Sequence, residues 1–175
     1  MSEYKRIIRA DAHRYDGKIP FYLKKVYRYL RKCQTAKNPL ARKLYDVLFF
    51  IVSRRRGIEI KPVTRIGEGL YLGHAYNITV GRDAVIGKNC NLHKGVTIGR
   101  ENRGSREGCP TIGDRVWIGV NATVVGKITI GDDVLIAPNS YVNRDVPSHS
   151  IVLGNPCVIK PRDNATEDYI KFTVD

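Results

Sequence analysis

The chain lacks the features that would place it in a membrane or outside the cell. Its longest apolar run, Val47 to Val52, is far shorter than the roughly 20 residues that a membrane span requires. Residues 1–14 are mostly polar and contain no apolar core of a signal peptide. The four cysteines form no C-x-x-C pair and no zinc-ligand spacing. These absences predict a reduced, cytoplasmic protein without a disulfide framework.

Acidic residues are scarce in the first third of the chain. Residues 1–57 hold sixteen Lys and Arg but only four Asp and Glu, whereas residues 58–175 hold fourteen and thirteen. The net charge of +13 therefore belongs almost entirely to the N-terminal segment. Either a solvated helix face or a peripheral contact with a membrane or a lipid-linked substrate would account for this charge. We expect no nucleic-acid partner, because no recognised binding motif accompanies the basic residues.

A six-residue repeat dominates the sequence from Ile60 to Val146. A helix repeats every 3.6 residues and a simple strand every two, so a period of six fits neither. Six residues form one side of a triangular coil, with a short strand, a turn and one inward aliphatic side chain. The repeat therefore predicts a parallel β-helix. Its aliphatic positions are Ile60, Ile66, Leu72, Ile78, Val80, Ile86, Leu92, Ile98, Ile112, Ile118, Val124, Ile130, Ile136 and Val142. A second small or apolar position lies four residues on, at Leu70, Ala84, Cys90, Val96, Val116, Ala122, Ile128, Val134 and Ser140.

Residues 1–57 lack this repeat and are predicted to be helical. Two amphipathic segments, Pro20 to Cys33 and Leu40 to Ser53, gather their apolar residues on one side. These residues are Tyr22, Leu23, Val26, Tyr29 and Leu30, then Leu44, Val47, Leu48, Ile51 and Val52. We expect both stripes to cap the open end of the coil, and packing on a sister subunit or on a membrane surface is the alternative.

The chain is thus expected to have three parts. A basic helical segment, residues 1–57, precedes a β-helix domain, residues 58–160, and a polar tail, residues 161–175, that is partly helical over 166–172. The repeat of the β-helix domain is interrupted twice, by a step of two residues after Ile78 and of fourteen after Ile98. The second interruption, residues 99–111, has no aliphatic residue and is predicted to leave the coil as an exposed, functional loop.

His74 is the histidine whose position best suits catalysis. A histidine acts as a base when a partner orients its ring and a pocket holds the acceptor. Glu59 precedes His74 by fifteen positions, close to the eighteen of one triangular coil, so the two side chains can meet on adjacent rungs. His93 is expected to point outward from a coil wall. No third imidazole lies on a matching coil, so we expect no metal.

At this point the sequence resembles a known family. The segments GIEIKPVTRIGEGLYLGHA, VTIG, PTIGDRVWIGVNATVVGKITIG and DVPSHSIVLGNP are similar to the serine acetyltransferase branch of the hexapeptide-repeat acyltransferases, over about residues 57–160. The resemblance implies a left-handed coil, a homotrimer, and acetyl-CoA bound between subunits. It implies that His74 takes a proton from the acceptor hydroxyl. It also implies that Glu59, where most members have Asp, orients His74.

Further site residues follow from the same comparison. We expect CoA to lie along the wall formed by Gly99, Val120 and Pro138, with Lys160 near its phosphates. The expected contacts of the acceptor, a small molecule or a glycan, are His93 and the loop residues Arg106, Glu107 and Cys109. Cys109 is assigned as a contact and not as a nucleophile, because nothing near it in the sequence would activate its thiol.

Three positions depart from the family pattern. Gly73 stands where the family has an acidic residue that holds the serine amine. Gly108-Cys109 stands where the family has an Arg-His pair, whose Arg binds the serine carboxylate. Lys61 stands where the family has a His. Each charge-assisted contact is worth roughly 1.5–3 kcal/mol, so losing two weakens serine binding by orders of magnitude. We therefore expect a neutral acceptor hydroxyl on a sugar, in surface polysaccharide biosynthesis. L-Serine O-acetylation is the alternative, and a non-catalytic β-helix scaffold is the alternative of another class.

Overall fold

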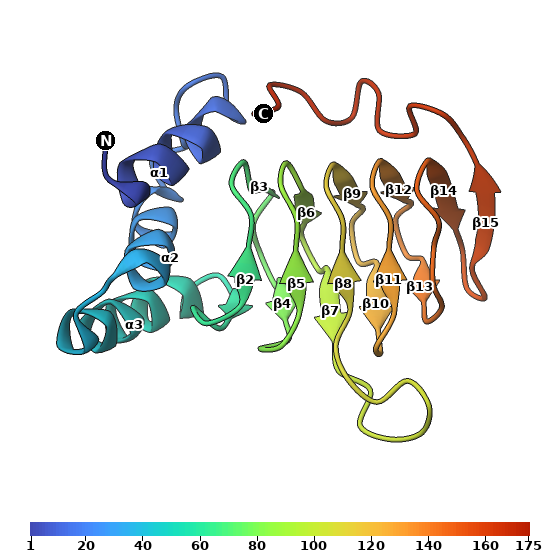
Figure 1. Cartoon of the computed structure of the whole chain (residues 1–175), viewed down its shortest axis with the longest axis horizontal. Coiled ribbons are helices and arrows are strands. Elements are labelled where there is room, and N and C mark those ends of the chain that lie inside the picture. The colour runs from blue at the N-terminus through green and yellow to red at the C-terminus, as the bar shows by residue number, and fades with distance from the viewer.

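The computed structural model describes residues 1–175 as three helices followed by a coil of short strands (Figure 1). The strands form three sheets, one along each side of the coil. The first sheet contains β1 (Glu59–Ile60), β4 (Thr79–Val80), β7 (Thr97–Gly99), β10 (Thr123–Val125) and β13 (Tyr141–Val142). The second contains β2 (Arg65–Ile66), β5 (Val85–Ile86), β8 (Thr111–Ile112) and β11 (Thr129–Ile130). The third contains β3 (Tyr71–Gly73), β6 (Asn91–His93), β9 (Val116–Ile118), β12 (Val134–Ile136), β14 (Ser150–Leu153) and β15 (Val158–Pro161). The predicted parallel β-helix is confirmed as a solenoid of about five turns.

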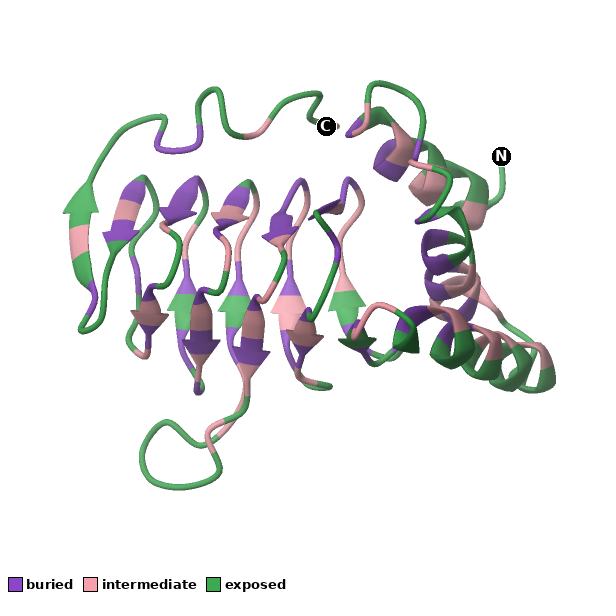
Figure 2. Ribbon diagram, turned by 180° about the vertical axis from the view of Figure 1, so that it is seen from behind, coloured by how far each residue is buried: buried purple, intermediate pink, exposed green.

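The aliphatic residues of the six-residue repeat are buried in the coil, and Figure 2 shows buried positions recurring along its strands. All of the aliphatic positions are buried except Ile66, which is half-buried, and all of the second positions are buried too. Residues on successive rungs lie in register, as Leu72, Leu92 and Ile118 do on β3, β6 and β9. Each rung therefore covers the apolar face of the next, and the stack forms a continuous core without disulfides.

The register of the strands shows where the coil is lengthened. Thr79 and Thr97 pair across one ordinary coil of eighteen residues. Glu59 pairs with Thr79, twenty residues on, and Thr97 pairs with Thr123, twenty-six residues on. The two extra residues of the first coil fall in the corner between β3 and β4, which contains His74. The eight extra residues of the third coil form the loop after β7, which projects from the coil as predicted (Figure 1).

Helices α1 (Glu3–His13) and α2 (Lys24–Thr35) close the first end of the coil (Figure 1). Leu23, Val26 and Leu30 of the first predicted stripe are buried there, as expected, together with Tyr27. Tyr29 of this stripe is only half-buried and Tyr22 is exposed, so the prediction is wrong for Tyr22. The buried Arg31 guanidinium pairs with Asp11 of α1, with Nε 2.7 Å from Oδ2. It also donates to the carbonyls of Ile66 and Gly67, both at 2.8 Å. The ion pair therefore joins both helices to the first rung.

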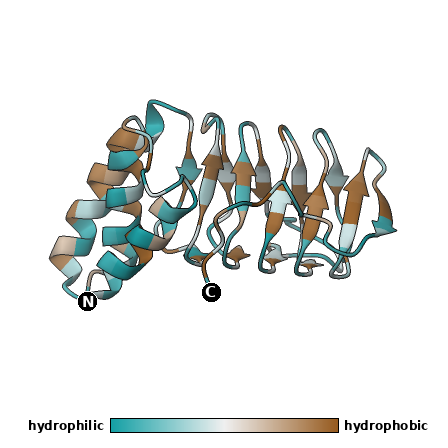
Figure 3. Cartoon of the chain, turned by 90° about the horizontal axis from the view of Figure 1, so that it is seen from above, coloured by the Kyte–Doolittle hydropathy of each residue, from teal (hydrophilic) through white to brown (hydrophobic).

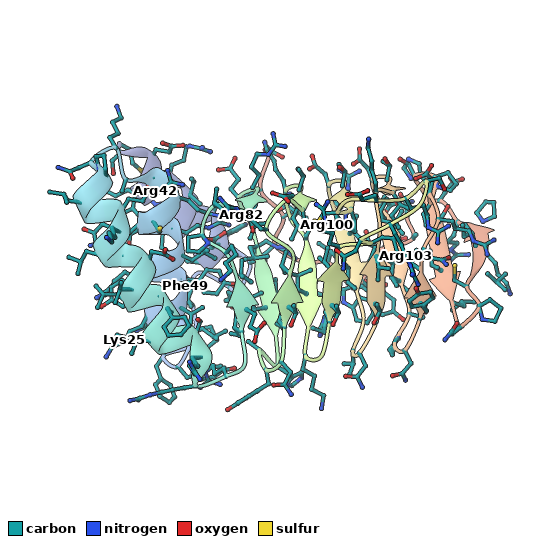
Figure 4. The ribbon with its side chains drawn as sticks, turned by 90° about the horizontal axis from the view of Figure 1, so that it is seen from below. Lys25, Arg42, Phe49, Arg82, Arg100 and Arg103 are labelled. Carbon is teal, nitrogen blue, oxygen red and sulfur yellow. The ribbon has the colours of Figure 1, made fainter.

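The second predicted stripe does not cap the coil, so that expectation is wrong for α3 (Pro39–Arg54). Leu44, Val47 and Ile51 are 56%, 52% and 52% exposed, because α3 packs chiefly against α2. Phe49, on the side of α3 that faces the coil (Figure 4), and Ser53 are the buried residues of this helix, and Val52 of the predicted stripe packs against the core. None of the three helices has the length and apolarity to span a bilayer.

The hairpin of β14 and β15 closes the other end of the coil. The chain then runs back along the third sheet toward the helices, as seen from above in Figure 3. The Asn89 side chain holds the end of this tail, since it accepts from the amide of Val174 at 2.9 Å and donates to its carbonyl at 2.7 Å. Arg14 donates to the Lys171 carbonyl at 3.1 Å. These contacts tie the tail to the first coils and to the N-terminal helices.

The tail contains turns in place of the short helix expected over residues 166–172, so that prediction is wrong. Asn164, Asp168 and Phe172 have φ values of 52°, 65° and 53°, in the left-handed region that interrupts a right-handed helix. The buried Asp133 carboxylate accepts the amide N–H groups of Ala165 and Thr166 at 3.1 and 3.0 Å. These amides are therefore engaged by a side chain outside the tail.

Candidate active site

His74 lies directly after β3, at the corner between the third and first sheets. Its φ of 50° is in the left-handed region, as are the φ values of Asn121 and Asn139 at later corners of the coil. The side chain is exposed and lines an open cavity of about 470 Å³. The other lining residues are Phe21, Tyr22, Arg56, Ala75, Tyr76 and Lys94.

This cavity, which we call the His74 cavity, is lined by cations and aromatic rings. The Arg56 guanidinium carbon lies 4.6 Å from the ring centroid of Tyr22 and 4.8 Å from that of Tyr76. No lining residue is acidic, and neither Arg56 nor Lys94 forms an ion pair. The local electrostatic potential is therefore positive beside the imidazole.

Within one chain, Glu59 and His74 line different cavities. The exposed side chain of Glu59 lines its cavity together with Phe49 and Arg54 of α3. Strand pairing places Glu59 opposite Thr79, five residues after His74. No hydrogen bond or ion pair joins the two side chains. The role of Glu59 as the group that orients His74 stays a prediction.

His93 lies beside His74, on the next rung. It pairs with Gly73 across β3 and β6. A Cβ atom on Gly73 would lie 2.5 Å from His93 Cε1 and nearer still to Nδ1. Nε2 of His93 is buried without a hydrogen-bond partner. Burial, followed by the charge of nearby His74, lowers the pKa of His93 to about 4, so this imidazole is neutral at neutral pH.

Aromatic side chains surround His93 along the outer side of the third sheet. Its ring centroid lies 4.7 Å from Trp117 and 6.3 Å from Tyr71. Tyr169 of the tail packs edge-on against Trp117, with centroids 5.2 Å apart. His93 thus points outward, as predicted, but it is half-buried among its neighbours.

The loop residues expected to contact the acceptor lie at a different corner from His74. The loop leaves the coil between the first and second sheets. The Arg106 carbonyl accepts from the Lys127 amide at 2.9 Å, and Glu107 pairs with Arg100 at 3.1 Å. Cys109 is half-buried and packs against the core. Within one chain the structure does not bring these residues to His74, so their role in acceptor binding stays a prediction.

Two of the residues expected to bind CoA share the coil edge that carries His74. Backbone hydrogen bonds join the successive corners of this edge, from the Gly95 amide to the Tyr76 carbonyl at 2.9 Å and from the Asn139 amide to the Val120 carbonyl at 2.9 Å. Val120 and Pro138 lie along this edge, whereas Gly99 ends β7 at the next edge and Lys160 lies on β15. All four cofactor assignments stay predictions. No group of three or more His, Cys, Asp or Glu side chains has a metal-binding arrangement.

Sequence reasoning missed the cations and rings of the His74 cavity. Arg56 looked like a basic residue at a helix end, and Tyr76 carried no signal of its own. The amide of Asn77 donates to the Arg56 carbonyl at 2.9 Å, which aligns the corner of Arg56 with that of Tyr76 one coil later. The first coil has twenty residues and not eighteen, so a regular period does not reveal this alignment.

Comparisons with known proteins agree with the repeated coil. A model described as "Bacterial transferase hexapeptide (six repeats)" matches residues 109–144, and "Hexapeptide repeat of succinyl-transferase" matches residues 77–101. Serine acetyltransferase 2 of Arabidopsis thaliana is 36% identical over 135 residues, which cover 71% of this chain and 42% of the plant protein. Serine acetyltransferase of Helicobacter pylori is 37% identical over 116 residues, which cover 66% of each chain.

Solved structures show the same architecture. The crystal structure of serine acetyltransferase from Brucella abortus superposes with a TM-score of 0.79 at 28% identity, over 94% of this chain and 71% of that one. Soybean serine acetyltransferase complexed with serine gives 0.72 at 29% identity, over 90% and 68%. This chain spans less than half the length of the Arabidopsis relative that it matches.

Proposed function

Because the chain belongs to the serine acetyltransferase family of hexapeptide-repeat acyltransferases, we propose that it transfers an acetyl group from acetyl-CoA to a hydroxyl acceptor. The observation that carries this proposal is the position of His74, exposed at a widened corner and beside a cavity. His74 takes the proton of the acceptor hydroxyl while the acceptor oxygen attacks the thioester carbonyl. The tetrahedral intermediate expels CoA as a thiolate, which receives the proton from His74. Backbone N–H groups of the coil stabilise the oxyanion of the intermediate.

We propose further that the active unit is a homotrimer. His74 and the loop of residues 99–111 lie at different corners of one coil, so a single chain does not bring them together. Side-by-side packing of coils would place the loop of one subunit near the His74 corner of its neighbour. The trimer would thereby complete the acceptor site and bring Arg106, Glu107 and Cys109 to it.

L-Serine is the first acceptor to test. The relatives from Arabidopsis and Helicobacter, and the solved structures from Brucella and soybean, are all serine acetyltransferases by name. The expectation of a sugar in surface polysaccharide assembly receives no support from these comparisons. They favour the alternative reading, O-acetylation of L-serine.

One observation keeps a sugar hydroxyl as the second candidate. The His93 ring occupies the space that a side chain at position 73 would need, and the His74 cavity has no acidic lining residue. The ammonium group of serine therefore has no carboxylate partner beside His74 within one chain. A sugar hydroxyl does not need such a partner, because it carries no positive charge.

Consumption of the acetyl-CoA thioester tests both candidates. One acceptor class is L-serine, and the other comprises sugars and nucleotide sugars. With one of these classes, the wild-type protein should consume thioester much faster than it hydrolyses acetyl-CoA with water alone. Mass spectrometry should then show the acetylated acceptor. His74→Ala should abolish this reaction while CoA binding, measured by calorimetry, persists. If the wild-type protein binds no CoA, the scaffold reading replaces the enzyme reading.

A further inference from the structure

We propose that the His74 cavity binds an anionic group of the hydroxyl acceptor, held by Arg56 and Lys94. The inference rests on the proposed acyl transfer, since it concerns the acceptor of that reaction. Two sources share the required chemistry, the carboxylate of L-serine and the phosphate of a phosphorylated sugar. The experiment below distinguishes these two sources from the phosphates of CoA.

The first argument is the balance of charge in the cavity. Its seven lining residues include two cations and His74, but no Asp or Glu. Neither Arg56 nor Lys94 pairs with a carboxylate elsewhere in the chain. Two unpaired cations in one concavity favour an anion.

The second argument is that Arg56 is held in place before any ligand binds. Its guanidinium lies between the rings of Tyr22 and Tyr76, at 4.6 and 4.8 Å from their centroids. These cation–π contacts restrict the side chain, so little additional conformational entropy is lost on binding. A guanidinium presents paired N–H donors that match the oxygens of a carboxylate or a phosphate.

The third argument is the position of the cations relative to the reacting group. Backbone hydrogen bonds stack the corners that carry Arg56, Tyr76 and Lys94, with the Asn77 amide 2.9 Å from the Arg56 carbonyl and the Gly95 amide 2.9 Å from the Tyr76 carbonyl. His74 lines the same cavity. An acceptor anchored there by its anionic group would therefore present a nearby hydroxyl to the imidazole.

Two pairs of probes, each differing by one anionic group, test the proposal by calorimetry. One pair is L-serine and L-serinamide, and the other is N-acetylglucosamine 1-phosphate and N-acetylglucosamine. In one pair, the member that carries the carboxylate or the phosphate should bind at least about tenfold more tightly than the analogue that lacks this group. The pair that shows the preference identifies the carboxylate or the phosphate as the ligand. Equal binding within both pairs would overturn the proposal.

Substitutions test whether Arg56 binds the anionic group. Arg56→Gln should remove the preference and raise the KM of the anionic acceptor by roughly tenfold to a hundredfold, with the KM of acetyl-CoA changed by less than about twofold. Arg56→Lys should restore part of the preference, because it keeps the charge but not the paired donors. Lys94→Gln should weaken binding in the same direction. Arg144→Gln, at an exposed arginine outside the cavity, is the matched control and should change nothing.

The outcomes separate this inference from the proposed function. If Arg56→Gln raises the KM of acetyl-CoA and not that of the acceptor, the cations bind CoA and the inference is wrong while the acyl transfer stands. If no acceptor is acetylated but the charge preference depends on Arg56, the site stands and the proposed reaction fails. Circular dichroism of each variant shows whether it is folded.

Discussion

Gly73 and His93 face each other on adjacent strands, and the His93 imidazole fills the space that any side chain at position 73 would need. A substitution at either position therefore changes the space available to the side chain at the other. Because His74 follows Gly73 directly in the chain, the pair lies next to the proposed catalytic base. A side chain at position 73 should therefore lower the stability of the protein.

Gly73→Ala should destabilise the protein by about 1–3 kcal/mol, because the new methyl group overlaps the His93 ring. Urea unfolding measures this change. In a His93→Ala background the same substitution should cost much less, so a double-mutant cycle should give a large coupling energy. Gly99→Ala is the control, since a Cβ atom there meets nothing nearer than 3.7 Å. An equal loss of stability in the wild type and in the His93→Ala variant would show that the new methyl group is not accommodated at the expense of the His93 ring.

The protonation of His93 should make stability depend on pH. Its pKa is about 4 in the folded protein, against about 6.5 for an unperturbed histidine. Between these values the unfolded chain binds a proton that the folded chain does not, so the free energy of unfolding falls as the pH is lowered from about 7 to about 4. The ring is partly exposed, so solvent screening reduces the size of the effect.

His93→Gln should lack this part of the pH dependence. Urea unfolding at about pH 7 and about pH 4.5 gives the change in the free energy of unfolding for the wild type and for the variant. Subtracting one change from the other removes the contributions of the other acidic and basic groups, which the two proteins share. An identical loss of stability in both proteins would mean that His93 is protonated in the folded state.

His74→Ala should lower turnover by roughly a hundredfold or more, because it removes the proposed general base. The KM of acetyl-CoA should change little, since the imidazole acts on the acceptor proton. His13→Ala provides the control, as His13 is an exposed histidine of α1. Steady-state assays with the acceptor that the thioester assay identifies make the measurement, and full turnover in His74→Ala would remove the mechanism.

Arg31→Ala should destabilise the protein by about 3–5 kcal/mol, because it leaves the buried Asp11 carboxylate without its partner. It also leaves the Ile66 and Gly67 carbonyls without their donors. Arg28→Ala, at an exposed position of the same helix, should change the free energy of unfolding by less than about 0.5 kcal/mol. Thermal or urea unfolding of the two variants compares a buried with an exposed arginine. Similar small losses would mean that the ion pair contributes little.

The architecture was predictable because the coil repeats itself. Ile118 and Ile136 occupy equivalent positions eighteen residues apart and stack in the core, so the period alone identifies them as buried. The loop after Ile98 was predictable for the same reason, since the absence of aliphatic residues marks a segment without an inward face.

The helical cap and the site were less predictable, because both depend on contacts that no period encodes. The stripe of Leu44, Val47 and Ile51 shows which residues share a face of α3, but not which surface covers that face. The pairing of Arg31 with Asp11 joins two helices whose relative placement is set by packing. The contact of His93 with Gly73 needed the true length of the first coil, which is two residues longer than the regular repeat.

Closure of both coil ends limits how the molecules can assemble. Open parallel edges at the ends of a solenoid would allow one molecule to add to another and build a fibre. Here α1 and α2 cover the first end, and antiparallel β15, with Lys160 and Pro161 at its end, terminates the other. Growth along the coil axis is therefore blocked, and the sides of the coil and the outer face of α3 are the surfaces left for finite, closed assemblies.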